Sequence, residues 1–254
     1  MARVPRIFCA EDLSPGRRLR LPEAGARHLL RVLRLRCGDT VRLFDGSGAE
    51  YAAVLIHTHG SVAEVTVTEP VATLPEPTLR VHLLQGVSRG ERMDWVIQKA
   101  TELGVCAVHP ILTARSVVKF SPDRALNRSR HWTAVAIAAC EQCGRSSLPE
   151  IVPPVPFDTA LVDCPATGMK LYLDAADGCA MTELARPQGG LALLIGPEGG
   201  LTPDERADAR AAGFQAVNMG PRVMRTETAA LAALAVAQTL WGDLSASPTP
   251  CRSA

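Results

Sequence analysis

Between residues 1 and 70, apolar and polar positions alternate in short segments, which is typical of half-buried strands. Residues 4–8, 40–44, 50–57 and 62–68 are predicted strands, whereas 23–35 has its apolar residues at helical spacing. The sequence Asp45-Gly46-Ser47-Gly48 separates two of the strands and predicts a hairpin turn. The pattern therefore predicts a small, mainly β domain over residues 1–72.

From residue 79 onward, short and continuous apolar runs alternate with amphipathic segments. The runs 79–85, 106–112, 170–173, 191–195 and 214–219 are predicted strands. Helices are predicted at 90–104 and 123–143, between Thr202 and Gly213, and in an Ala/Leu-rich segment that ends at about Trp241. Such alternation favours a parallel α/β sheet over residues 79–245. Three prolines mark residues 70–78 as a linker, and 246–254 lack a core-forming pattern and are predicted to be disordered.

Two loops follow the predicted strands near the C-terminus. The loop 196–200 reads GPEGG, and a second loop opens with Gly220-Pro221 and carries Arg222 and Arg225 into an Ala/Leu-rich helix. Loops at the carboxyl ends of parallel strands share one crevice, where ligands bind. Neither loop has the glycine spacing of the common nucleotide-binding motifs. A tight packing turn explains GPEGG alone, but it does not explain the arginines, the acid and the threonines of the second loop.

Composition narrows the choice of protein class. The chain has 254 residues, of which 47% are hydrophobic, and no apolar run approaches the ~20 residues of a membrane span. No apolar signal region follows the basic N-terminus, so a cytoplasmic protein is expected. The eight cysteines are scattered, which favours reduced thiols, and Cys140 and Cys143 lack the further ligands of a zinc site, so no metal is expected.

The charge is small in total but unevenly distributed. The net charge is +1, yet residues 1–42 hold ten arginines and four acidic residues, a balance of +6 that leaves −5 for the rest of the chain. A basic segment of this kind suggests a polyanionic partner. Any single arginine is explained by a solvated surface, but together they favour contacts with RNA phosphates.

Several stretches resemble one known family. GPEGGLTPDE at 196–205 and MGPRVMRTETAALAALA at 219–235 resemble the RsmE-type 16S ribosomal RNA (uracil-N3)-methyltransferases, which belong to the SPOUT class. PRIF at 5–8, HLLRVLR at 28–34 and LFDGSG at 43–48 are similar to the same family, so the resemblance extends over nearly the whole chain.

The resemblance implies an α/β fold, a SPOUT-type parallel sheet with a C-terminal trefoil knot, preceded by a PUA-like RNA-binding β-barrel. It implies S-adenosylmethionine as cofactor, a homodimer, and 16S rRNA or the assembled small ribosomal subunit as partner, without metal or membrane. By position, the implied cofactor-binding residues are Leu173, Ile195, Gly196, Pro197, Gly199, Gly200, Met219, Gly220, Arg222, Val223 and Thr226.

Methyl transfer to uracil N3 requires loss of a weakly acidic proton, hence a general base and a cation near the uracil oxygens. Arg225 is the candidate cation, and Glu227 or Glu198 is the candidate for positioning or accepting the proton. Glu227 is explained nearly as well as an acid that stabilises a helix N-terminus. The candidate RNA-binding residues are Arg3, Arg6, His28, Arg31, Arg34 and Arg145.

Two other functions stay open at this point. One is a knotted RNA methyltransferase that modifies a ribose 2′-hydroxyl or a guanine, and the identity of the methylated nucleoside distinguishes it. The other is a non-catalytic RNA-binding assembly factor, which the absence of cofactor binding would favour. A metabolic enzyme with a basic accessory domain is the weakest alternative.

Overall fold

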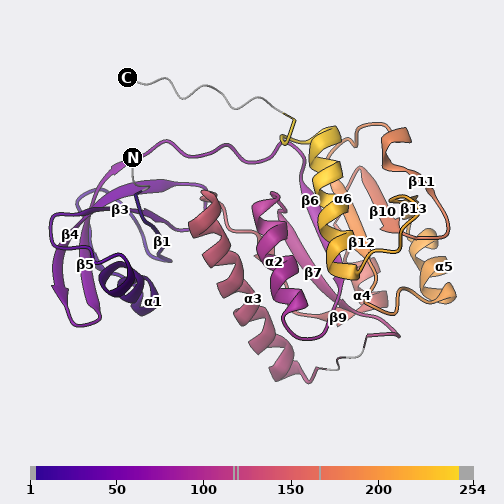
Figure 1. The fold of residues 1–254 in the computed structure, drawn as a ribbon, viewed down its shortest axis with the longest axis horizontal. Helices are drawn as coiled ribbons and strands as arrows, with labels where there is room; N and C mark the ends of the chain where they lie inside the picture. Colours follow the sequence, from indigo (N-terminus) through magenta and orange to yellow (C-terminus); the bar gives the residue numbers. More distant parts are fainter. Residues whose placement is uncertain (1–3, 117, 119, 166, 246–254) are drawn as a thin grey trace. The chain divides into compact units, whose positions relative to one another are not determined.

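The computed structural model describes residues 4–116, 118, 120–165 and 167–245. The chain divides into two compact units (Figure 1). The first contains Met1–Glu76 and Ile137–Leu148, and the second contains Pro77–Ala136 and Pro149–Ala254. The chain passes from the first unit to the second between Glu76 and Pro77, and residues 137–148 return to the first unit, a return that was not foreseen.

The first unit is built around a five-stranded sheet. Its strands are β1 (Arg6–Phe8), β2 (Arg18–Arg20), β3 (Thr40–Phe44), β4 (Glu50–His59) and β5 (Val62–Pro70), in the order β1-β3-β4-β5-β2. Strand β1 pairs parallel to β3, and the other pairs are antiparallel. Alternate residues of each strand point inward, and Val41, Leu43, Val65 and Val67 are among those fully buried. This is the period-2 pattern that predicted these strands.

The helical segment of the first unit is shorter than predicted. Helix α1 (Glu23–Arg27) continues as a π-helix, η1 (His28–Val32), and the helix ends there rather than at residue 35. Arg34 follows with φ of 58°, the only positive φ of a non-glycine residue in the described part of the chain. Apolar spacing alone does not distinguish an α-helix from one widened by a π-turn.

The second unit has one eight-stranded sheet in which every pairing between described strands is parallel. The order is β11-β13-β10-β12-β6-β7-β8, with β9 beside β7. The strands are β6 (Val81–Gly86), β7 (Ala107–Leu112), β8 (Glu150–Ile151), β9 (Val155–Pro156), β10 (Met169–Leu173), β11 (Cys179–Ala180), β12 (Leu191–Ile195) and β13 (Gln215–Asn218).

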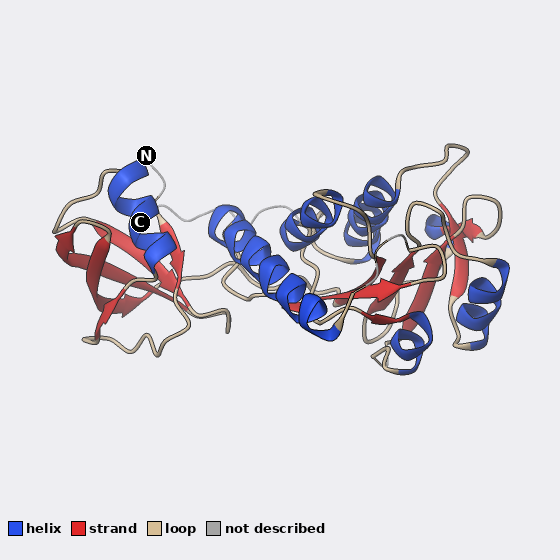
Figure 2. Ribbon diagram, turned by 90° about the horizontal axis from the view of Figure 1, so that it is seen from below, coloured by secondary structure: helices blue, strands red, loops and turns tan. Residues whose placement is uncertain are grey.

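Helices cover both faces of this sheet (Figure 2). They are α2 (Arg92–Glu102), α3 (Pro122–Cys143), α4 (Phe157–Val162), η2 (Met181–Glu183), α5 (Pro203–Ala211) and α6 (Thr226–Trp241). Helices α2 and α6 pack against each other, and α4 and α5 pack on the core that contains Tyr172 and Leu194. Strand β12 is fully buried, as its continuous apolar run predicted.

Helix α5 begins at a capping box. The Thr202 hydroxyl accepts the N–H of Glu205 at 3.1 Å, and the Glu205 carboxylate accepts the N–H of Thr202 at 2.8 Å. Glu205 also accepts the N–H of Ala114 at 2.7 Å, so the loop after β7 is held beside the loop after β12. No helix of the described residues is long and apolar enough to cross a membrane.

Candidate active site

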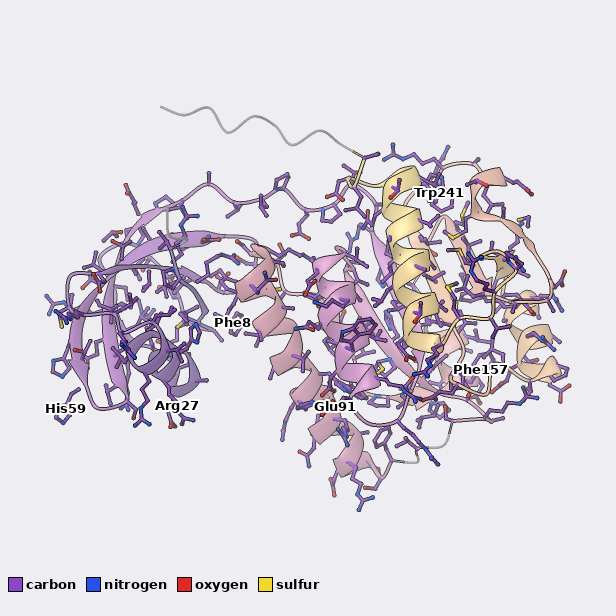
Figure 3. The ribbon with its side chains drawn as sticks, in the orientation of Figure 1. Phe8, Arg27, His59, Glu91, Phe157 and Trp241 are labelled. Atoms are coloured by element: carbon purple, nitrogen blue, oxygen red, sulfur yellow. The ribbon has the colours of Figure 1, made fainter. Side chains whose placement is uncertain are left out.

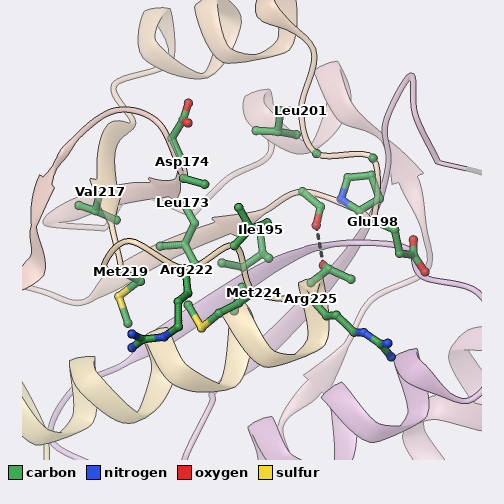
Figure 4. Close-up of a pocket in the computed structure, with 18 of the residues that line it drawn as sticks. Leu173, Asp174, Ile195, Glu198, Leu201, Val217, Met219, Arg222, Met224 and Arg225 are labelled. Atoms are coloured by element: carbon green, nitrogen blue, oxygen red, sulfur yellow. Dashed lines mark hydrogen bonds between the residues drawn. The ribbon is translucent and has the colours of Figure 1, made fainter.

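A cavity of about 640 Å³ lies at the carboxyl ends of β10, β12 and β13 in the second unit (Figure 4). Three loops that are distant in sequence form its walls, and the start of α6 and Arg92 of α2 complete it. The size suits a ligand of the dimensions of a nucleoside cofactor. This is the crevice expected where parallel strands end.

The cavity contains every residue that the sequence assigned to cofactor binding: Leu173, Ile195, Gly196, Pro197, Gly199, Gly200, Met219, Gly220, Arg222, Val223 and Thr226. It also contains residues outside that assignment, among them Arg92, Asp174, Leu201, Val217 and Met224. Asp174 directly follows β10, and its position at a strand end was the available signal. Arg92 lies in a helix that carries no glycine loop, so local sequence gave no indication of it.

Thr226 connects three of these segments. Its hydroxyl donates to the carbonyl of Gly196 at 2.6 Å (Figure 4, dashed line) and accepts from Gln85 Nε2 at 2.9 Å. Gln85 is fully buried near the end of β6. The start of α6, the GPEGG loop and the end of β6 are therefore held together by one side-chain relay. Buried polar networks of this kind stabilise a unique arrangement when their members are paired.

Glycines are required where the loops approach the sheet. A Cβ at Gly86 would lie 2.4 Å from the nitrogen of Pro197, so the main chains of β6 and the GPEGG loop are in direct contact. Gly200 has φ of 67°, a conformation that other residues adopt only at a cost. Arg115 closes the loop by donating to the carbonyl of Gly199 at 2.8 Å.

A second relay joins the loops after β13 and β10. Asn218 donates to the carbonyls of Asp174 and Ala175 at 3.4 and 3.1 Å, and it accepts the N–H of Gly220 at 2.6 Å. Arg206 of α5 holds the Asp174 carboxylate at 3.1 Å. Both side walls of the cavity are thus fixed by hydrogen bonds to main-chain atoms.

Arg92 lies between the two carboxylates proposed for catalysis. It donates to Glu198 at 2.7 Å, and its Nε is 3.9 Å from Glu227. Burial alone would raise the pKa of Glu198, but hydrogen bonds from its own N–H, from the N–H of Arg89 and from Arg92 outweigh it and lower the pKa. Glu198 is therefore a weak proton acceptor.

Glu227 does not line the cavity. Its side chain is buried in the first turn of α6, where Oε2 has no hydrogen-bond partner among the described residues. Arg225, by contrast, lines the cavity and is exposed, and its guanidinium forms no ion pair within the described part of the chain. In Figure 4 its side chain extends to the side on which Glu198 lies. Of the three candidate catalytic residues, Arg225 and Glu198 share the cavity.

The RNA-binding candidates that the structure describes lie in the first unit, and the structure corrects one of them. Arg6 is buried and contacts Glu50 at 2.8 Å, the carbonyl of Arg145 at 2.9 Å and the Ser146 hydroxyl at 3.0 Å, with a further bond to the Cys140 carbonyl. Its guanidinium is fully engaged inside the unit, so it is a structural residue and not a phosphate ligand.

The remaining RNA-binding candidates include both internal and exposed side chains. The side chain of Arg145 is 9% exposed and forms an ion pair with Glu76 at 2.8 Å, so it too is mainly internal. His28 and Arg31, in η1, and Arg34, just after it, are exposed. Arg3 lies outside the described residues. Within the part of the chain that is described, no cluster of metal-ligating side chains is present.

The fold and the cavity define an α/β enzyme that binds a nucleoside-sized cofactor where its parallel strands end. Residues 75–238 match the RNA methyltransferase domain family, and residues 21–67 match the RNA methyltransferase PUA domain. The chain belongs to this RNA methyltransferase family.

Relatives of known structure and name agree with this assignment. The chain is 40% identical to ribosomal RNA small subunit methyltransferase E of Neisseria gonorrhoeae, solved with S-adenosylmethionine, with a TM-score of 0.88 and coverage of 95% of this chain and 100% of that one. A Legionella pneumophila protein solved with the same cofactor is 36% identical, with a TM-score of 0.91 and coverage of 96% and 100%. Ribosomal RNA small subunit methyltransferase E of Bacillus subtilis is 30% identical and covers 82% of this chain and 84% of its own length. The predicted family and the fold class, a SPOUT-type sheet with a PUA-like unit, are confirmed.

Proposed function

We propose that the protein transfers a methyl group from S-adenosylmethionine to N3 of a uridine in the 16S rRNA of the small ribosomal subunit. The observation that carries the proposal is the cavity itself, since all the residues expected to bind the cofactor line it and Arg225 lies on its rim. The names of the relatives support ribosomal RNA as the substrate. A cytoplasmic location is part of the proposal, since it suits an rRNA substrate.

The residues present fit the cofactor. Leu173, Ile195 and Val217 supply apolar surface for an adenine ring, and the main chains at Gly196 and Gly220 also line the cavity. Bound there, S-adenosylmethionine supplies an electrophilic methyl group on a sulfonium. The three loops would hold and orient it without a charged side chain against the adenine.

Arg225 is proposed to stabilise the negative charge that develops on the uracil oxygens as N3 loses its proton. The lowered pKa of Glu198 and its contact with Arg92 suit a positioning role. Glu227 has one carboxylate oxygen without a hydrogen-bond partner among the described residues, but it does not line the cavity. It would influence the reaction only through Arg92, whose Nε lies 3.9 Å away. Because N3 lies on the base-pairing edge, the uridine would be read unpaired.

A homodimer is part of the proposal. No charged residue occurs from Thr228 to Trp241, although α6 has an outer face with Leu240 40% exposed. The partly exposed residues of that face are Ala229, Leu231, Ala232, Ala235 and Val236. Helix faces of this kind are typical of interfaces between subunits, and Leu240→Glu should shift the molar mass in solution from dimer to monomer.

The test is mass spectrometry of nucleosides from small-subunit rRNA incubated with the protein and methyl-labelled S-adenosylmethionine. Labelled 3-methyluridine is the expected product. Arg225→Ala should lower turnover about 10²- to 10³-fold with little change in cofactor affinity, whereas Arg210→Ala, an exposed residue paired with Asp177, should leave turnover unchanged. Label on a ribose or a guanine would refute the uracil assignment, and no label together with no cofactor binding would favour an RNA-binding assembly factor.

A further inference from the structure

The first unit has an exposed turn that combines two aliphatic side chains with two arginines. We call Arg31, Val32, Leu33 and Arg34 the apolar–basic turn. Val32 is 65% exposed and Leu33 is 41% exposed, and both flanking arginines are exposed as well. Leu29 and Ala26, which precede the turn, are completely buried. The same short helix thus anchors one side in the core and presents aliphatic side chains to solvent on the other.

The backbone of the turn explains this exposure. The N–H of Leu33 bonds the carbonyl of His28 at 3.1 Å, the five-residue step of a π-turn, and the N–H of Leu35 bonds the carbonyl of Leu29 at 3.0 Å. Arg34 adopts φ of 58°, the left-handed position at which helices usually end with glycine. The wider turn shifts Val32 and Leu33 out of the buried stripe. Rare π-turns and non-glycine residues at positive φ concentrate at functional sites.

Charge pairing in the unit isolates the same turn. Arg6 and Arg42 contact Glu50, Arg17 contacts Glu11 and Asp12, and Arg27, which projects from α1 (Figure 3), contacts Glu23 at 2.5 Å. The arginines that have no acidic partner among the described residues of the unit are Arg18, Arg20, Arg31, Arg34 and Arg36. Three of these five lie in the apolar–basic turn or within two residues of its end, so the unneutralised positive charge is concentrated around Val32 and Leu33.

We infer that the apolar–basic turn binds an unstacked nucleotide of the RNA substrate. Val32 and Leu33 would contact the face of a base or the exposed end of a stack, and Arg31 and Arg34 would contact the phosphates on either side. Aliphatic wedges placed between basic side chains are a known means of holding nucleic acid in an unstacked conformation. A protein partner fits less well, since two aliphatic residues surrounded by unpaired cations demand an anionic ligand. The inference rests on the proposed function, because it takes rRNA as the substrate. The contact that it assigns is remote in sequence from the cavity residues.

The experiment uses the full-length protein and a small-subunit rRNA transcript, with binding measured by filter retention at several salt concentrations. Arg34→Gln should reduce the slope of log K against log salt by about 0.7, the value for one phosphate contact on a single strand. Val32→Ser/Leu33→Ser should weaken binding about tenfold without changing that slope. Arg17→Gln is the matched control, because the arginine removed already has Asp12 as a partner at 2.9 Å, and it should leave both quantities unchanged.

A further variant separates binding from folding. Arg34→Gly keeps the left-handed backbone and removes its steric cost, so it should raise the thermal midpoint of the first unit in calorimetry while weakening RNA binding as Arg34→Gln does. Opposite signs for stability and affinity are not expected of a residue with only a structural role.

The possible results distinguish a failure of this inference from a failure of the proposed function. If the variants bind RNA with wild-type affinity and salt slope while the wild type still methylates the transcript, the inference is overturned and the proposed function is not. If Val32→Ser/Leu33→Ser changes only the molar mass in solution, the turn is a contact between copies of the chain and the inference is again overturned. A wild type that neither binds nor methylates rRNA removes the proposed function as well.

Discussion

The buried Arg6–Glu50 pair gives a sharp prediction about stability. The two side chains are 5% and 3% exposed, and Arg6→Met removes the charge while retaining a chain that can pack on the ring of Phe44, 4.6 Å from the guanidinium. Glu50 would keep Ser146 at 2.7 Å and Arg42 at 3.5 Å. Removing one partner of a buried ion pair costs about 3–5 kcal/mol, because the other charge stays buried. We expect a loss near the lower end of that range, since Arg42 compensates in part.

The measurement must report on the first unit alone. All three tryptophans, Trp95, Trp132 and Trp241, lie in the second unit, so tryptophan fluorescence does not monitor the first. Hydrogen exchange of peptides that cover β3 and β4 gives the opening free energy where the pair is located. The loss should appear in these peptides and be small in those that cover β12.

The control for this substitution is Arg27→Met, which removes an exposed pair whose side chains are 58% and 69% exposed and should cost at most about 1 kcal/mol. The pH dependence provides a second check. Burial opposes ionisation of Glu50, but hydrogen bonds from Arg6 and Ser146 and the charge of Arg6 lower its pKa. Its contribution to stability is therefore present above the unfolded pKa of about 4.3 and is lost as the pH falls through the folded pKa. An Arg6→Met protein within 1 kcal/mol of the wild type at pH 7 would refute this account.

Three further predictions concern the second unit. Thr226→Val removes the hydroxyl between Gly196 and the end of β6 and should cost about 1–3 kcal/mol; calorimetric titration should show cofactor binding weakened at least tenfold and restored by Thr226→Ser. Gly86→Ala forces a Cβ against Pro197 and should weaken cofactor binding at least as much, whereas Gly213→Ala, which meets open space, should change stability only. Burial, followed by the charge of His82, lowers the pKa of His109 to about 4, so the unfolded state binds the extra proton first and stability should fall from pH 6.5 to 4; His109→Gln should remove most of that dependence, and an unchanged pH profile would contradict the assignment.

Much of the site was predictable because it depends on local sequence. Strand β12 and the loop 196–200 are recognisable in the sequence as an apolar run followed by glycines. The parallel sheet then places the strand-end loops together. Arg92 and Gln85 were not foreseen, because their roles exist only once α2 and β6 meet α6 in three dimensions.

Two features of the first unit, the burial of Arg6 and the π-turn, were not foreseen for a related reason. Arg6 looks like any basic surface residue until Glu50 and the carbonyls near residue 140 enclose it, and those partners are 44 and about 135 residues away in sequence. The π-turn escaped notice because its apolar spacing fits an ordinary helix. Long-range pairing and small changes in helical pitch both lie beyond what a pattern of hydrophobic positions encodes.

The return of residues 137–148 to the first unit has a consequence for how the protein is made. Roughly 70 residues are synthesised between the end of β5 and the segment that supplies the acceptors of Arg6, and at 5–20 residues per second this takes about 4 to 14 s. During that interval the nascent N-terminal sheet exists without its last segment, and the Arg6–Glu50 pair lacks its enclosure. A fragment that ends at residue 76 is in the same condition permanently. The N-terminal unit is thus a domain in space that translation completes only after more than half of the chain has been made.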